Sequence, residues 1–203
     1  REMSTNSNNN DSLRWYQRLA LELLWACCCI IGYMPRWFRY GVFKPFVYAV
    51  LRLLRYRRKV VYRNIRGSFP EKSEKEIKRI INASYSMLAE VIVDTICLAG
   101  AKRRGELNHV NWVNRDEHLA RTKGRDWIAM ASHYGCWEYF PLWSLEDSEE
   151  QFLGVYHTLK SVVFEHFYRR LRDYAPNYHQ VPMKETLRVY MRTRSDKYST
   201  VLG

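Results

Sequence analysis

Hydrophobic and polar positions divide the chain into a helical front part and a back part in which strands and helices alternate. Ser73 and Glu76 have the spacing of a helix-capping box. Apolar residues then recur at helical spacing, at Ile77, Ile80, Ile81, Leu88, Val91 and Ile92. This pattern predicts a helix over residues 73–98.

From residue 127 onward, short apolar runs alternate with amphipathic segments. The apolar runs predict strands at 127–132, 152–156, 179–181 and 198–202. The segments between them predict a turn into a helix at 133–145 and helices at 161–174 and 184–194. Strands and helices that alternate in this way are typical of an α/β sheet with crossover helices.

The N-terminal residues show neither of these patterns. Residues 1–12 are polar and rich in Ser and Asn, which predicts a disordered tail. Residues 13–34 contain an uninterrupted apolar run of only about 12 residues, short of the roughly 20 that span a bilayer. Two interpretations remain open, a marginal transmembrane or re-entrant helix and a helix that lies in the membrane plane. We therefore predict a membrane-associated helical segment over residues 13–66 and an α/β domain over residues 67–203.

Charge strengthens the membrane interpretation. The net charge is +12, from 33 basic and 21 acidic residues. Residues 36–66 contain no Asp or Glu, and their basic residues include the close group Arg55, Arg57, Arg58 and Lys59. Aromatic and aliphatic residues are interleaved with them, a mixture that suits an anionic membrane surface and a cytoplasmic placement of the following chain. The same mixture can bind RNA, so a non-catalytic membrane-binding or nucleic-acid-binding module is an alternative.

The cysteines predict neither a disulfide framework nor a metal site. Three of the five are adjacent, at Cys27, Cys28 and Cys29, and no CxxC pair exists. We expect a reducing compartment and no bound metal.

His133 and Glu138 are the candidate catalytic pair. His133 directly follows a predicted strand, where ligands of open α/β sheets bind. Five residues turn a regular helix by about 500°, so the pair cannot share one helical face. It can act together if His133 lies in the turn before the helix and Glu138 in the first helical turn. Gly135 would ease that turn.

A histidine general base oriented by a carboxylate suits the removal of a proton from a hydroxyl that attacks an acyl group. The adjacent helix N-terminus could hold the developing oxyanion. The alternative is structural, namely a hydrogen-bonded histidine and a glutamate that favours the helix N-terminus.

The run Ser132 to Glu138 resembles the H-x-x-x-x-[D/E] motif of lysophospholipid acyltransferase-like enzymes, and most closely the H-x-G-N-W-E block of lipid A biosynthesis (late) acyltransferases. These are lauroyl and myristoyl transferases of Gram-negative bacteria. Three further blocks resemble that family in order. They are residues 56–73, residues 154–172 and residues 181–188.

The resemblance implies a glycerolphosphate-acyltransferase-like α/β fold with a mixed sheet flanked by helices. It implies His133 as general base, Glu138 as its orienting partner, and Arg172, Gly135 and Trp137 in substrate binding. It also implies acyl-acyl carrier protein as co-substrate with no other cofactor, a lipid A precursor as acceptor, no nucleic acid, and the cytoplasmic face of the inner membrane. The basic group at Arg55, Arg57, Arg58 and Lys59 would contact membrane lipids or the carrier protein.

Two expectations follow from where the resemblance stops. Members of that family continue beyond the point that corresponds to Gly203, so we expect a C-terminally truncated member whose strand at 198–202 is interior to the sheet. The acceptor is not fixed by these blocks, and a lysophospholipid or aminolipid is the alternative within the same chemistry.

Overall fold

The computed structural model describes residues 13–107, 111, 113–122, 125–130, 132–145, 151–193 and 198–202. The predicted disordered tail at residues 1–12 lies outside these ranges. The chain divides into two compact units. The helical unit is Cys28–Ala99, and the α/β unit is Arg1–Cys27 with Gly100–Gly203. The predicted functional division at residue 66 stays a prediction.

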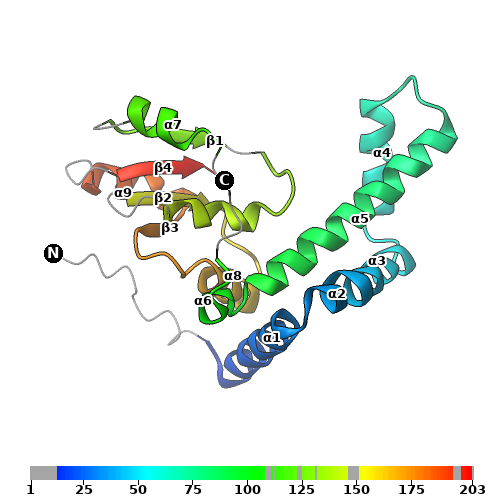
Figure 1. The fold of residues 1–203 in the computed structure, drawn as a ribbon, viewed down its shortest axis with the longest axis horizontal. Helices are drawn as coiled ribbons and strands as arrows, with labels where there is room; N and C mark the ends of the chain where they lie inside the picture. The colour runs from blue at the N-terminus through cyan, green and yellow to red at the C-terminus, as the bar shows by residue number, and fades with distance from the viewer. Residues whose placement is uncertain are drawn as a thin grey trace. The chain divides into compact units, whose positions relative to one another are not determined.

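The helical unit is built around one long helix (Figure 1). Its elements are the last third of α1 (Trp15–Tyr33), α2 (Arg36–Phe38), the π-helical η2 (Arg39–Phe43), α3 (Lys44–Leu53), α4 (Arg58–Ser68) and α5 (Glu74–Leu98). α3 and α4 both pack on α5. The core consists of Leu51, Ile77, Ile81, Tyr85 and Ala89.

The predicted helix at 73–98 is confirmed as α5, and so is its capping box. The Ser73 side chain accepts a hydrogen bond from the backbone N–H of Glu76, and the Glu76 side chain accepts one from the backbone N–H of Ser73. Both free N–H groups are thereby satisfied at the first turn. This local arrangement explains why the sequence located the start of the helix to the residue.

The turn between α3 and α4 has an unusual backbone. Arg55 and Arg57 have positive φ angles of 50° and 48°, a conformation that non-glycine residues adopt at a cost. The buried Tyr85 hydroxyl donates a hydrogen bond of 2.6 Å to the carbonyl oxygen of Tyr56, between these two arginines. A hydrogen bond from α5 therefore fixes the backbone of the basic turn.

Within the described residues, one helix is long and apolar enough to cross a membrane, and it is α5. The core helix of a soluble protein meets the same criteria, and α5 supplies the core of the helical unit. The apolar segment predicted at residues 13–34 is a helix, α1. It meets the criteria only together with Arg36–Leu53, as a pair bent by 111°. Such a bent pair is typical of a broken span or a re-entrant loop.

The α/β unit contains a small parallel sheet (Figure 1). Its described strands are β1 (Ile128–Met130), β2 (Gln151–Tyr156), β3 (Tyr178–Pro182) and β4 (Tyr198–Leu202). They are ordered β1-β4-β2-β3. Its helices are α6 (Ala101–Arg104), α7 (Arg115–Thr122), η3 (Trp137–Leu145), α8 (Val162–Leu171), η4 (Met183–Glu185) and α9 (Thr186–Thr193). The predicted alternation of strands and helices is thus present, in a chain that is mostly helical.

The predicted mixed sheet is wrong for these strands, because all three described pairings are parallel. The reason lies in the connections. α8 joins β2 to β3, and η4 with α9 joins β3 to β4. A helical crossover returns the chain to the same edge of the sheet, so the next strand runs parallel to the last. β4 lies between β1 and β2, as expected for an interior strand.

The first two thirds of α1 belong to the α/β unit, where they pack on α8. The Trp25 and Phe167 rings meet edge to face, with centroids 5.9 Å apart. Arg170 donates to both carboxylate oxygens of Glu22, at 2.8 and 3.0 Å. α1 therefore holds α8 through both a ring contact and an ion pair, and Phe167 and Leu171 of α8 are buried.

Candidate active site

The loop after β1 carries the candidate histidine. Gly135 has a φ of 64°, a left-handed conformation that costs glycine little. The chain bends there, and η3 begins at Trp137. His133 thus lies in the turn and Glu138 in the first helical turn, the arrangement that the five-residue spacing required. The helix differs from expectation in being 3₁₀ rather than α, and it contains Pro141, which lacks the N–H that a regular ladder needs.

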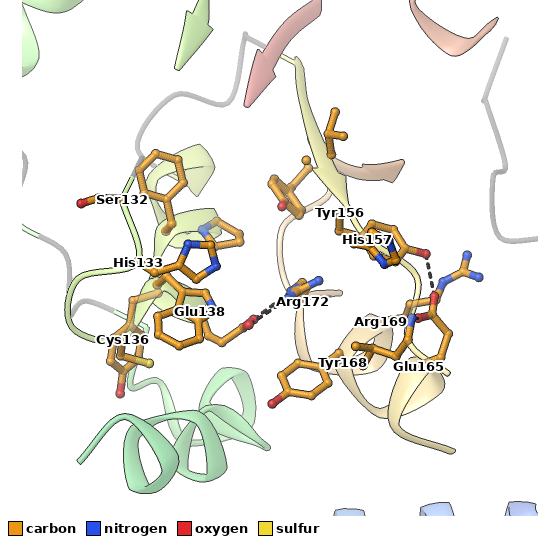
Figure 2. Close-up of a pocket in the computed structure, with 18 of the residues that line it drawn as sticks. Ser132, His133, Cys136, Glu138, Tyr156, His157, Glu165, Tyr168, Arg169 and Arg172 are labelled. Atoms are coloured by element: carbon orange, nitrogen blue, oxygen red, sulfur yellow. Dashed lines mark hydrogen bonds and ion pairs between the residues drawn. The ribbon is translucent and has the colours of Figure 1, made fainter. Parts of the chain in front are cut away.

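A pocket of about 630 Å³ opens at the carboxyl end of β2. The β1–η3 loop and η3 line one wall, and the end of β2, the following loop and α8 line the other (Figure 2). Of the predicted site residues, His133, Trp137, Glu138 and Arg172 line it. Gly135 does not belong to the lining, so its contribution is to the turn.

Glu138 and Arg172 form a buried ion pair across this pocket (Figure 2). Arg172 donates from Nε to Oε2 and from Nη2 to Oε1, each at 2.8 Å. The side chains are only 4% and 19% exposed. Such a two-point contact fixes both the position and the orientation of the carboxylate. The sequence did not reveal this pair, because 34 residues separate its members.

Aromatic residues surround the guanidinium of Arg172. The Tyr168 and Tyr156 ring centroids lie 5.4 and 5.9 Å from its central carbon. Burial alone would lower the pKa of Arg172, but the hydrogen bonds and the charge of Glu138 outweigh it and raise that pKa. Arg172 therefore stays cationic, and Glu138 is the carboxylate that it pairs with.

His133 is exposed to the pocket and its imidazole has no hydrogen-bond partner among the residues that the structure describes. Its ring rests against Trp137, with centroids 4.7 Å apart. Glu138 bonds to Arg172 rather than to His133 in this structure. The predicted roles of His133 as base and of Glu138 as its orienting partner stay predictions.

A second hydrogen-bonded acid lines the pocket, and sequence reasoning missed it. Glu165, in the first turn of α8, accepts from the Tyr156 hydroxyl at 2.8 Å and from the Leu159 backbone N–H at 2.9 Å. Burial and this hydrogen bond raise the pKa of Tyr156 to about 12, so its hydroxyl stays protonated and donating. Glu165 thereby fixes the loop between β2 and α8. An acid at a helix start was the available signal.

The sequence did not identify Gly154 as a site residue either, although a glycine inside a predicted strand often marks a position where another group packs closely against the strand backbone. A methyl group added there would overlap the ring and hydroxyl of Tyr178. The hydroxyl end of the Tyr178 ring thus lies close to the backbone of β2 at Gly154, and Tyr178 lines the pocket. Burial raises the pKa of this tyrosine to about 12.

The predicted membrane-binding and carrier-binding residues lie in the helical unit, at and after its strained turn. Arg55, Arg57, Arg58 and Lys59 are all exposed. None of the four forms an ion pair with another residue in the described part of the chain. Their charges are therefore available to an anionic partner.

The comparisons with known proteins gave one match. A family model described as bacterial lipid A biosynthesis acyltransferase matches residues 8–198. Searches of curated proteins and of solved structures found no significant match.

Proposed function

Because the chain belongs to the bacterial lipid A biosynthesis acyltransferase family, we propose that it moves a fatty acyl chain from acyl carrier protein to a hydroxyl of a lipid A precursor. We propose His133 as the general base. The supporting observation is an exposed imidazole that lines a pocket at the end of a parallel sheet, opposite a fixed ion pair.

In the proposed reaction, the imidazole of His133 removes the proton of the acceptor hydroxyl as its oxygen attacks the thioester carbonyl. The carbonyl electrons move onto oxygen and then re-form the double bond, which expels the carrier thiolate. The imidazolium returns its proton to that sulfur. The products are an oxygen ester and a free thiol, and the base is regenerated.

Glu138 stabilises the imidazolium in this proposal. Its carboxylate is held on the same wall of the pocket as His133 (Figure 2). Hydrogen bonds of catalytic groups often tighten only when substrate is bound, and a direct bond to His133 would form at that stage. In this role Glu138 acts through its carboxylate, whose position and orientation the ion pair with Arg172 fixes.

Arg172, Gly135 and Trp137 form the proposed substrate-binding set. Arg172 uses Nε and Nη2 for Glu138, which leaves Nη1 for substrate. Gly135 contributes by shaping the turn between His133 and η3, and N–H groups at the start of η3 would hold the oxyanion. Trp137 supports the imidazole ring and gives the acyl chain an apolar wall.

The exposed basic turn supports a placement at the cytoplasmic face of the inner membrane. Arg55, Arg57, Arg58 and Lys59 would bind anionic lipid headgroups or the acidic carrier protein. Apolar residues that precede this turn are exposed, at Val42 in η2, at Phe46, Val50 and Leu53 in α3, and at Leu54 directly after α3. Basic and apolar side chains together are typical of a membrane interface.

The test is acyl transfer from labelled acyl carrier protein in membranes, for the wild type and His133→Ala. We expect a loss of about 10²–10⁴-fold in kcat with unchanged membrane binding. Lysophospholipid acceptors assayed in parallel examine the alternative acceptor. If His133→Ala keeps its turnover, the proposed mechanism fails. If only the removal of charge at Arg57, Arg58 and Lys59 abolishes function, the non-catalytic binding module is the better description.

A further inference from the structure

Three arginines at the end of α8 differ in what surrounds them. Arg170 is paired with Glu22 and lies over the Trp25 ring, 4.2 Å from its centroid. Arg172 is paired with Glu138. Arg169 lines the pocket, and its guanidinium forms no ion pair or hydrogen bond with any residue that the structure describes. Of the three, Arg169 alone presents an uncompensated cation to the pocket.

The availability of Arg169 has a specific cause. Glu165 stands four positions earlier on the same helix, the spacing at which Glu and Arg commonly pair. The Glu165 carboxylate is oriented toward the β2–α8 loop instead, where it accepts from the Tyr156 hydroxyl (Figure 2) and from the Leu159 N–H, and it forms no ion pair with Arg169 in the described part of the chain. The N-terminus of α8 stabilises the same carboxylate. Glu165 is thus used to fix the β2–α8 loop, and Arg169 is left for another partner.

We propose that Arg169 binds a phosphate ester of one of the two substrates, an inference that rests on the proposed function. A guanidinium presents paired donors that match two oxygens of a phosphate. At Arg172 an incoming phosphate would compete with a bidentate carboxylate, whereas at Arg169 it would not.

The position of Arg169 also fits the chemistry. Residues three apart on a helix share a face, so Arg169 and Arg172 line the same wall of the pocket. Figure 2 shows Arg169 on the α8 side of the pocket and His133 on the other side, so a phosphate held by Arg169 would leave the space around His133 free for the reacting carbonyl. Arg169 is therefore a binding residue that positions substrate and takes no part in proton transfer.

The experiment measures binding without turnover, on the full chain in detergent micelles. Calorimetry compares 4′-phosphopantetheine with pantetheine, and a phosphorylated glucosamine disaccharide with its dephosphorylated form. The first pair reports on the acyl donor and the second on the acceptor. Each ligand is titrated into the wild type, Arg169→Gln, Arg169→Lys and the matched control Arg170→Gln, after circular dichroism has shown native helix content.

We expect the phosphate to improve affinity by about tenfold or more in the wild type, for at least one ligand pair. Arg169→Gln should lose this gain, Arg170→Gln should keep it within about twofold, and Arg169→Lys should keep part, because lysine binds phosphate as a point charge. Loss in the first pair assigns the phosphate to the donor, and loss in the second assigns it to the acceptor.

The inference is overturned if Arg169→Gln still distinguishes phosphorylated from dephosphorylated ligand as well as the wild type does. It is also overturned if phosphate adds no affinity in the wild type for either pair. Neither result depends on His133, so a protein without acyl-transfer activity would contradict the proposed function and leave this measurement valid.

Discussion

The two units place their charged side chains in opposite ways. In the helical unit, charge stays at the surface. Lys44 and Glu90 pair with side chains that are 24% and 49% exposed, and the basic turn has no acidic partner among the described residues. In the α/β unit, Glu138 and Arg172 pair inside a pocket with 4% and 19% exposure. Surface charge can meet a variable partner such as a membrane, whereas a buried pair can hold one geometry.

Exposed and buried ion pairs also differ in how much they matter for stability. Exposed ion pairs stabilise a protein by about 0–1 kcal/mol. Removing one partner of a buried pair costs about 3–5 kcal/mol, because an uncompensated charge stays inside. We therefore expect substitutions in the exposed basic turn of the helical unit to affect binding, and substitutions within the Glu138–Arg172 pair to affect folding.

The largest effect should come from Glu138→Gln. Arg172 would lose its counter-ion, and the cost should lie toward the lower end of about 3–5 kcal/mol, since Arg172 keeps some exposure. Hydrogen exchange measured by mass spectrometry gives the protection of backbone amides in each unit separately. We expect weaker protection in η3 and α8 and unchanged protection in α5. Glu90→Gln is the matched control, and we expect a cost of no more than about 1 kcal/mol. Equal costs for the two substitutions would contradict the contrast drawn here.

Gly154→Ala tests how tightly the pocket is packed. The added methyl group would overlap the Tyr178 ring, so the ring or β2 must shift, at a cost of about 1–3 kcal/mol. Denaturant unfolding measures the cost. Tyr178→Ala carries a cost of its own, but in that background the addition of Gly154→Ala should cost less than it does in the wild type, because the overlapping ring is gone. Gly41→Ala is the control, since nothing lies within 4 Å of a methyl group there. A single variant as stable as wild type would show that Tyr178 is free to move.

Tyr85→Phe tests how the helical unit holds its basic turn. The substitution removes the 2.6 Å hydrogen bond to the Tyr56 carbonyl and keeps the buried ring. We expect a loss of about 0.5–1.5 kcal/mol and faster hydrogen exchange in residues 54–58. Protection in the α/β unit should not change. Unaltered exchange in the turn would mean that α3 and α4 fix it without help from α5.

The sequence predicted the elements of both units better than it predicted the contacts between elements. The capping box at Ser73 and Glu76 lies within four residues, so its pattern could be read locally. The turn at Gly135 could be inferred for the same reason. The pairing of Glu138 with Arg172 depends on how η3 and α8 pack on the sheet, which no local pattern encodes. The parallel register depends in the same way on crossovers that bring separate segments together.

The smallest effect, and the sharpest test of the surface turn, concerns Arg57. Its φ of 48° would suit glycine better than arginine, so Arg57→Gly should relieve strain. Glycine also makes the unfolded chain more flexible, and we expect a net change in stability within about 1 kcal/mol of zero.

If the Arg57 cation serves binding, the affinity of Arg57→Gly for vesicles that contain anionic lipid should fall by about 1 kcal/mol, or roughly fivefold. Arg57→Lys keeps both the charge and the strained backbone, so its affinity should match wild type. Affinity for zwitterionic vesicles should not differ among the three proteins, because the lost attraction is electrostatic. If Arg57→Gly bound anionic vesicles as well as Arg57→Lys does, the strained arginine would have no role in membrane binding, and the assignment of the turn to an anionic surface would have to rest on its neighbours.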